Sequence, residues 1–118
     1  YPGSNNVENI GWYKENSNCM THSVGDLLPN ELGLYDLGGN VWEWCWDRFA
    51  EKSTLFENGG ESAKDVQDPK GPAVGNTRVI KGGSWNNLEG DLIISNRFHN
   101  YPADGYYNIG FRIACTII

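Results

Sequence analysis

One short run of residues constrains the fold more than any other part of the chain, because three tryptophans alternate within it. The run Val41–Asp47 (VWEWCWD) follows directly on the glycine turn Gly38–Asn40. Successive side chains of a β-strand point to opposite faces, so Trp42, Trp44 and Trp46 would share one face. Burial of three indoles is favourable by about 25 cal/mol for each Å² of apolar surface removed from water. The run therefore predicts a strand that anchors the core.

The rest of the composition favours turns over helices. Glycine and asparagine together account for 29 of the 118 residues, and both tolerate positive φ and populate turns. Both are unfavourable in helix interiors, so a helical bundle is excluded. The longest apolar runs are only a few residues, and no transmembrane segment is expected. The length is that of a single domain.

Charge and cysteine content narrow the function further. The formal net charge is −6, and the acidic excess lies in residues 1–69. Because phosphate binding needs a basic footprint, nucleic acid is not an expected partner. The three cysteines leave an odd thiol, which argues against a disulfide framework. Cys45 and Cys115 fall in strand patterns and are interpreted as small buried side chains, whereas Cys19 lies near His22 and is only a weak metal signal. The compartment is left open.

Three further elements are predicted from local patterns. Residues 7–16 suggest a short helix, and residues 78–81 a short strand that stops at a glycine pair. The final residues, 110–118, alternate again and predict a central strand. Its core face would carry Phe111, Ile113, Cys115 and Ile117.

Four motifs in a fixed order carry a specific resemblance. They are Gly33–Asp36 (GLYD), Gly39–Trp44 (GNVWEW), Arg78–Trp85 (RVIKGGSW) and Asn108–Arg112 (NIGFR). Together they resemble the formylglycine-generating-enzyme (sulfatase-modifying factor) family. The resemblance implies an α+β fold, namely the irregular, loop-rich C-type lectin fold of that family with little regular secondary structure. It also implies that residues 1–118 are a single C-type-lectin-like domain, equivalent to the C-terminal half of the family unit.

The resemblance also bears on catalysis. Similar enzymes oxidise a sulfatase cysteine to formylglycine and hold copper through two cysteines that follow the Gly-Gly-Ser-aromatic motif. Thiolates suit monovalent copper, but the matching positions here are Asn87 and Leu92. The resemblance thus implies a non-catalytic member with no copper. The alternative is a formylglycine-generating-type oxidoreductase, or the C-terminal half of one, that uses cysteines or a second chain not apparent from the sequence.

Residues 86–109 form a tract with no helix or strand period. Of these 24 residues, only Glu89 lies outside the amino acids that codons ending in C can encode. The tract resembles the variable region of diversity-generating-retroelement proteins, which is displayed on a C-type lectin fold, and Tyr and Asn suit an adaptable binding surface. The alternative is an ordinary surface loop. On the first interpretation the partner is a protein or other macromolecule, contacted by Leu88, Gly90, Asp91, Ile93, Phe98, His99, Tyr101, Ala103, Asp104, Tyr106 and Tyr107.

A calcium site is implied at the turn before the tryptophan run. The family residues that hold calcium match Asp36, Gly39, Val41 and Glu43, and an all-oxygen set of carboxylates and carbonyls suits this hard cation. A carboxylate opposite the tryptophan face would also be costly without a partner, which a cation could supply. The alternative is that Glu43 is hydrogen-bonded to Arg48 or to backbone amides.

Overall fold

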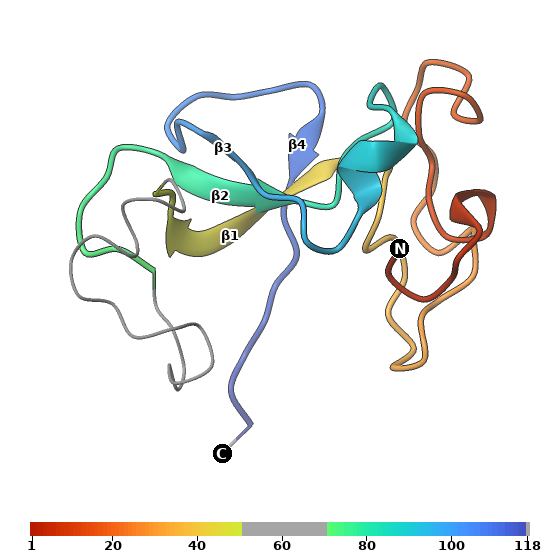
Figure 1. Cartoon of the computed structure of the whole chain (residues 1–118), viewed down its shortest axis with the longest axis horizontal. Coiled ribbons are helices and arrows are strands. Elements are labelled where there is room, and N and C mark those ends of the chain that lie inside the picture. Colours follow the sequence, from red (N-terminus) through yellow and green to blue (C-terminus); the bar gives the residue numbers. More distant parts are fainter. Residues whose placement is uncertain (51–70, 118) are drawn as a thin grey trace.

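Short elements joined by long loops make up the chain. The computed structural model describes residues 1–50 and 71–117. Two 3₁₀ turns and four short strands occur there (Figure 1), and their bounds are η1 Val7–Asn9, β1 Trp42–Arg48, β2 Arg78–Lys81, η2 Glu89–Leu92, β3 Phe98–Asn100 and β4 Ile109–Gly110. The loop-rich architecture predicted from glycine and asparagine content is confirmed. None of the described helices is long and apolar enough to cross a membrane.

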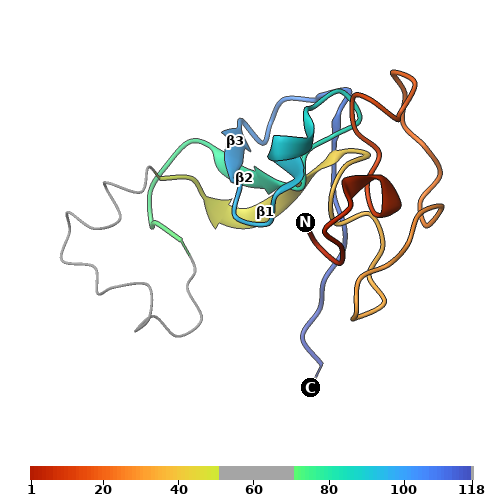
Figure 2. The same ribbon diagram turned by 45° about the vertical axis from the view of Figure 1, so that its right-hand side comes forward.

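The four strands form one sheet in the order β3-β2-β1-β4. Strands β1 and β2 pair antiparallel, as do β2 and β3, whereas β1 and β4 pair in parallel. Figures 1 and 2 show the loops of residues 1–40 gathered at one end of this sheet. The sheet register is given by the pairs Glu43 with Lys81, Trp44 with Ile80, Val79 with His99, and Trp42 with Ile109.

A bulge in β1 determines which of the three tryptophans is exposed. Trp44 lies opposite Ile80, but the next paired residue, Arg48, lies opposite Arg78, so β1 advances four residues while β2 advances two. Trp46 falls in this bulge and is 82% exposed, whereas Trp42 is 5% exposed. The prediction of three buried indoles on one face is therefore wrong for Trp46, and Trp44 is only partly buried.

The prediction of a central C-terminal strand is also wrong. Strand β4 ends at Gly110 and lies at an edge of the sheet. Beyond it the described residues 111–117 are irregular and exposed, and they run away from the body of the molecule (Figure 1). Cys115 is exposed as well, and Cys45 is half-buried, so neither is the fully buried thiol expected. Alternation alone does not bury a strand: the pairing between β1 and β4 ends at Glu43 and Gly110, although β1 itself continues to Arg48.

The predicted helix over residues 7–16 is reduced to the single turn η1. Its start is capped by Asn6, whose Oδ1 accepts a hydrogen bond from the Glu8 amide at 3.1 Å. Asn16 then ends the run, because its Oδ1 accepts from the Tyr13 amide at 2.8 Å. The turn still contributes to the core, in which the described residues Val7, Tyr13 and Leu92 are buried together.

Gly39 lies where two backbone segments pass very close to each other. Its φ is +81°, and a Cβ added there would lie 2.4 Å from the carbonyl oxygen of Trp12. The Gly39 amide donates to the Gly82 carbonyl, and the next amide, of Asn40, donates to that Trp12 carbonyl, each at 2.8 Å. Three segments distant in the sequence therefore meet at one residue that must lack a side chain.

Replacing Gly39 should expose this dependence. We expect Gly39→Ala to lower the free energy of unfolding by about 3 kcal/mol or more, because the clash with Trp12 adds to the strain of positive φ. Gly33→Ala should cost only about 1 kcal/mol, since Gly33 has φ +75° but open space around it. Urea unfolding of both variants and of Gly90→Ala, which has neither feature, measures this; equal losses would contradict it.

Candidate functional site

A buried serine connects the two ends of the tract 86–109. Ser84 is fully buried, and its Oγ lies 2.6 Å and 2.5 Å from the Oδ1 atoms of Asn86 and Asn87. From the far end of the tract, Asn108 Nδ2 donates to Ser84 Oγ at 3.3 Å and to Asn86 Oδ1 at 3.2 Å. These side chains form a polar framework beneath the tract, which we call the amide framework (Ser84, Asn86, Asn87 and Asn108).

Side chains inside the tract extend this framework. Asp91 accepts hydrogen bonds from the side-chain amides of Asn87, at 3.0 Å, and Asn96, at 3.3 Å. The Tyr106 hydroxyl donates to Asn100 Oδ1 at 2.5 Å. The tract is thus an ordered surface that contains the 3₁₀ turn η2 and the strand β3, although its sequence shows no period.

The predicted contact residues divide into two groups. Three of them are partly buried and contribute to order: Asp91 and Tyr106 through the bonds above, and His99 by stacking on Phe49 with ring centroids 4.0 Å apart. The other eight are exposed: Leu88, Gly90, Ile93, Phe98, Tyr101, Ala103, Asp104 and Tyr107. The structure therefore leaves eight residues of the predicted set, seven of them with a side chain, directly accessible to a partner.

A cavity of about 340 Å³ opens beneath the tract. Its apolar walls are Trp42, Ile80, Phe98 and Ile109, and its polar lining comes from Asn87, Asp91, Asn100 and Asn108. Phe98 stacks on Trp42 with ring centroids 5.9 Å apart, so the exposed tract rests on the buried indole of β1. The tract is therefore supported from below by the sheet.

Asn87 and Leu92, which the sequence resemblance matches to the copper ligands of similar enzymes, both have structural roles. Asn87 Oδ1 accepts from the Ser84 amide at 3.1 Å, and Leu92 is 1% exposed within the core. Burial raises the pKa of the Cys45 thiol, with Lys81 acting weakly in the opposite direction. Residues 1–50 and 71–117 hold no group of three or more His, Cys, Asp or Glu side chains suited to a metal ion.

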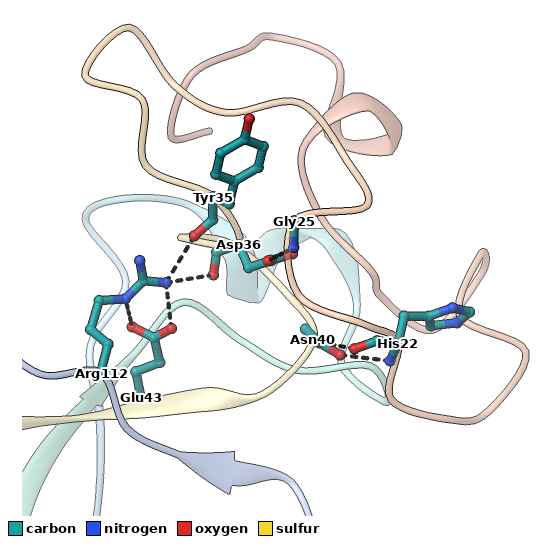
Figure 3. A network of polar contacts seen from close by, with 7 residues as sticks. All are labelled: His22, Gly25, Tyr35, Asp36, Asn40, Glu43 and Arg112. Carbon is teal, nitrogen blue, oxygen red and sulfur yellow. Dashed lines mark hydrogen bonds and ion pairs between the residues drawn. The ribbon is translucent and has the colours of Figure 1, made fainter.

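The second candidate site lies where Arg112 meets the turn before β1 (Figure 3). The Arg112 guanidinium donates to both carboxylate oxygens of Glu43, from Nε at 2.6 Å and from Nη2 at 2.5 Å. Nη2 also donates to the carbonyls of Tyr35, at 3.0 Å, and Asp36, at 3.2 Å. The hydrogen bonds to Glu43 raise the pKa of Arg112 above its ordinary value. Glu43 is therefore paired with Arg112, and not with Arg48 as the alternative held.

Asp36 brings an unpaired oxygen to the same place. The residue is 9% exposed with φ +56°, and its Oδ2 accepts from the Gly25 amide at 2.8 Å. Its Oδ1 is buried and has no hydrogen-bond partner among the described residues. Asp36, Gly39, Val41 and Glu43 line one open pocket of about 440 Å³. The four residues predicted for calcium are thus brought together, and one of their carboxylate oxygens lacks a partner.

Sequence reasoning missed the role of Asn40, which follows the glycine turn. Asn40 is 6% exposed, and its amide group bonds both the backbone N–H of His22, at 3.0 Å, and its carbonyl, at 3.1 Å. His22 in turn stacks on Trp12 with ring centroids 3.7 Å apart, and its Nε2 lies 2.7 Å from the Ser17 carbonyl. His22 therefore has a structural role. The sequence signal for this contact was Asn40, which belongs to the GNVWEW motif.

A family model and several curated proteins match most of this chain. The family model for the sulfatase-modifying factor enzyme 1-like domain matches residues 1–117. A formylglycine-generating enzyme of Streptomyces coelicolor is 34% identical over 103 residues, which cover 85% of this chain and 31% of the enzyme. The serine/threonine-protein kinase pkn1 of Chlamydia pneumoniae is 35% identical over 120 residues, which cover 99% of this chain and 18% of the kinase. The chain thus spans less than a third of the length of these relatives.

Two solved structures are similar in fold to this chain. Treponema denticola variable protein 1 superposes with a TM-score of 0.78 and 37% identity over 92% of this chain and 38% of that protein. PvdO from Pseudomonas aeruginosa superposes with a TM-score of 0.69 and 25% identity over 94% of this chain and 42% of that protein.

The amide framework can be tested through Ser84. We expect Ser84→Ala to lower the free energy of unfolding by about 2 kcal/mol, because buried amide groups of the tract lose their shared hydroxyl. Ser95→Ala, at an exposed position of the same tract, should change it by less than about 0.5 kcal/mol. Urea unfolding of both variants measures the difference, and a Ser84 variant as stable as the Ser95 variant would contradict the framework.

Proposed function

The chain belongs to the sulfatase-modifying factor family and has its loop-rich α+β C-type lectin fold, and we propose that it is a non-catalytic, ligand-binding member. The ligand is contacted by the exposed side chains of residues 86–109, and it is a protein or other macromolecule. The likeness to a variable protein supports this proposal. We further propose that residues 1–118 act as one C-type-lectin-like domain equivalent to the C-terminal half of the family unit.

One observation carries the proposal, namely the division of the tract into framework and exposed side chains. The amide framework bonds the tract to itself and to Ser84, while Leu88, Tyr101 and Tyr107 are 60%, 55% and 75% exposed. Single exposed apolar side chains are normal on a protein surface, whereas several gathered in one region are typical of an interaction site. Tyrosine offers large contact area at low conformational cost, which suits a surface that binds different partners.

The absence of catalysis is proposed from the residues at the copper-ligand positions. Neither Asn87 nor Leu92 can supply a thiolate, and their side chains already serve the tract and the core. Cys19 and Cys115 are exposed, and Cys45 is half-buried in β1. The competing function is a formylglycine-generating-type oxidoreductase. Stoichiometric monovalent copper held by the purified chain would favour that enzyme over the binding protein.

A second proposed property is a calcium site at Asp36, Gly39, Val41 and Glu43. The observation that favours it is the buried, unpartnered Oδ1 of Asp36, a residue that lines the same pocket as the other three. An unsatisfied buried carboxylate oxygen is costly, and a hard cation with oxygen ligands would satisfy it. When bound, the ion would supply positive charge to this turn.

Two libraries test the binding function. In the first, the eight exposed positions of the predicted contact set are randomised; in the second, the four residues of the amide framework are. We expect clones of the first to keep a melting temperature within about 4 °C of the parent and to yield binders when selected against a purified protein such as lysozyme. Clones of the second should unfold. Loss of folding in the first library, or selection that returns no binder from it, would contradict the proposal.

Calcium binding is tested on metal-stripped protein. We expect titration with calcium chloride to give heat for one site and to raise the melting temperature, because a ligand at 100 times its Kd adds about 2.7 kcal/mol of stability. Asp36→Asn should abolish both effects while its side-chain oxygen still accepts from Gly25. Asp104→Asn, at an exposed carboxylate, is the matched control. Neither heat nor stabilisation in the parent protein would defeat the site.

A further inference from the structure

The guanidinium of Arg112 already contacts one of the four residues proposed for calcium through its carboxylate, namely Glu43. It bonds both oxygens of Glu43 and the carbonyls of Tyr35 and Asp36, at distances from 2.5 to 3.2 Å (Figure 3). Arg112 and Glu43 also line the same pocket as Asp36. Any cation that binds there meets a positive charge that is already in contact with one of its two carboxylates.

The contact matters because Arg112 changes the net charge of the pocket. Its lining residues include two carboxylates, Asp36 and Glu43, and one permanent cation, Arg112, which leaves a formal charge of −1 in place of −2. Two cations that share Glu43 repel each other, and water screens part of the repulsion because the side chains of Arg112 and Glu43 are 37% and 21% exposed.

We propose that Arg112 is an internal competitor for the cation at this site. Its guanidinium and calcium share the oxygens of Glu43, so each weakens the hold of the other on that side chain. The inference rests on the proposed calcium site. Arg112 is thus a residue that sets the affinity of the site, and it does so from outside the GNVWEW motif.

The competition has a structural consequence for the end of the described chain. Within residues 111–117, the structure describes side-chain hydrogen bonds for Arg112. By contrast, Phe111, Ile113 and Ile117 are 77%, 90% and 94% exposed. Arg112 therefore attaches this segment to the turn before β1. Because coupling between two binding events is reciprocal, calcium binding loosens the attachment by the factor with which Arg112 weakens calcium binding.

Two substitutions separate competition by charge from simple positioning of Glu43. Arg112→Gln removes the charge, whereas Arg112→Lys keeps it and loses the two-pronged geometry. We expect calcium to bind the Gln variant about tenfold more tightly than the parent protein, and the Lys variant with an affinity close to that of the parent. Calorimetric titration with calcium chloride at one ionic strength measures the three affinities, and the melting temperature of each metal-free protein checks its folding.

Each outcome bears on a different statement. Calcium binding that is tighter in the Gln variant than in the parent protein supports competition. Equal affinities, or a loss in both variants, overturn competition and leave the calcium site standing. No binding to the folded parent protein overturns the calcium site, and competition with it.

A measurement on the parent protein does not depend on the variants folding. The Nε–H proton of Arg112 donates to Glu43, so its exchange with water, followed by NMR, reports on this ion pair. We expect calcium to accelerate the exchange by about the tenfold factor seen in affinity, with the Nε–H of Arg97 as internal reference. Unchanged exchange at saturating calcium would overturn the competition.

Discussion

The fold depends on hydrogen bonds from asparagine side chains to backbone groups that have no strand or helix to satisfy them. Backbone N–H and C=O groups must be paired wherever they are buried, and here the sheet pairs only a small share of them. Asn40 bonds backbone groups 18 residues earlier in the chain, and Asn16 and Asn87 bond amides three residues earlier, at distances of 2.8 to 3.1 Å. A side-chain amide both donates and accepts, so one residue can serve two orphaned groups. The asparagine content is therefore structural before it is functional.

Part of the fold could be predicted from the sequence, namely the two strands that coincide with recognised motifs. Strands β1 and β2 lie where the VWEW and RVIK patterns indicate, and the loop-rich architecture follows from composition. The bulge that expels Trp46 could not be predicted, because it depends on how β1 pairs with β2 and not on alternation within β1. The final strand failed for a related reason, since residues 111–117 carry a core-like pattern but the described part of the molecule pairs them with nothing. Periodicity reports which residues could share a face, and only pairing decides whether that face is covered.

The candidate site was predictable to a similar depth. The family motif placed Asp36 and Glu43 around one pocket, but the partner of Glu43 lies 69 residues away in the NIGFR motif, and the sequence did not connect the two. Likewise, the composition of the tract marked its surface without separating Tyr107, which is exposed, from Tyr106, which bonds Asn100. Long-range hydrogen bonds between side chains are invisible to single-sequence reasoning, because spacing along the chain carries no information about them.

The bond between Asn108 and Ser84 closes the tract into a loop whose ends are fixed to each other on a buried hydroxyl. The entropy lost in closing a loop grows only with the logarithm of its length, so each doubling costs about 0.6 kcal/mol. A loop clamped in this way can therefore lengthen or shorten at its exposed turns with little effect on the sheet beneath. Under the proposed binding function, this loop could therefore vary by insertion and deletion as well as by substitution, and a longer loop could reach a partner from the same scaffold.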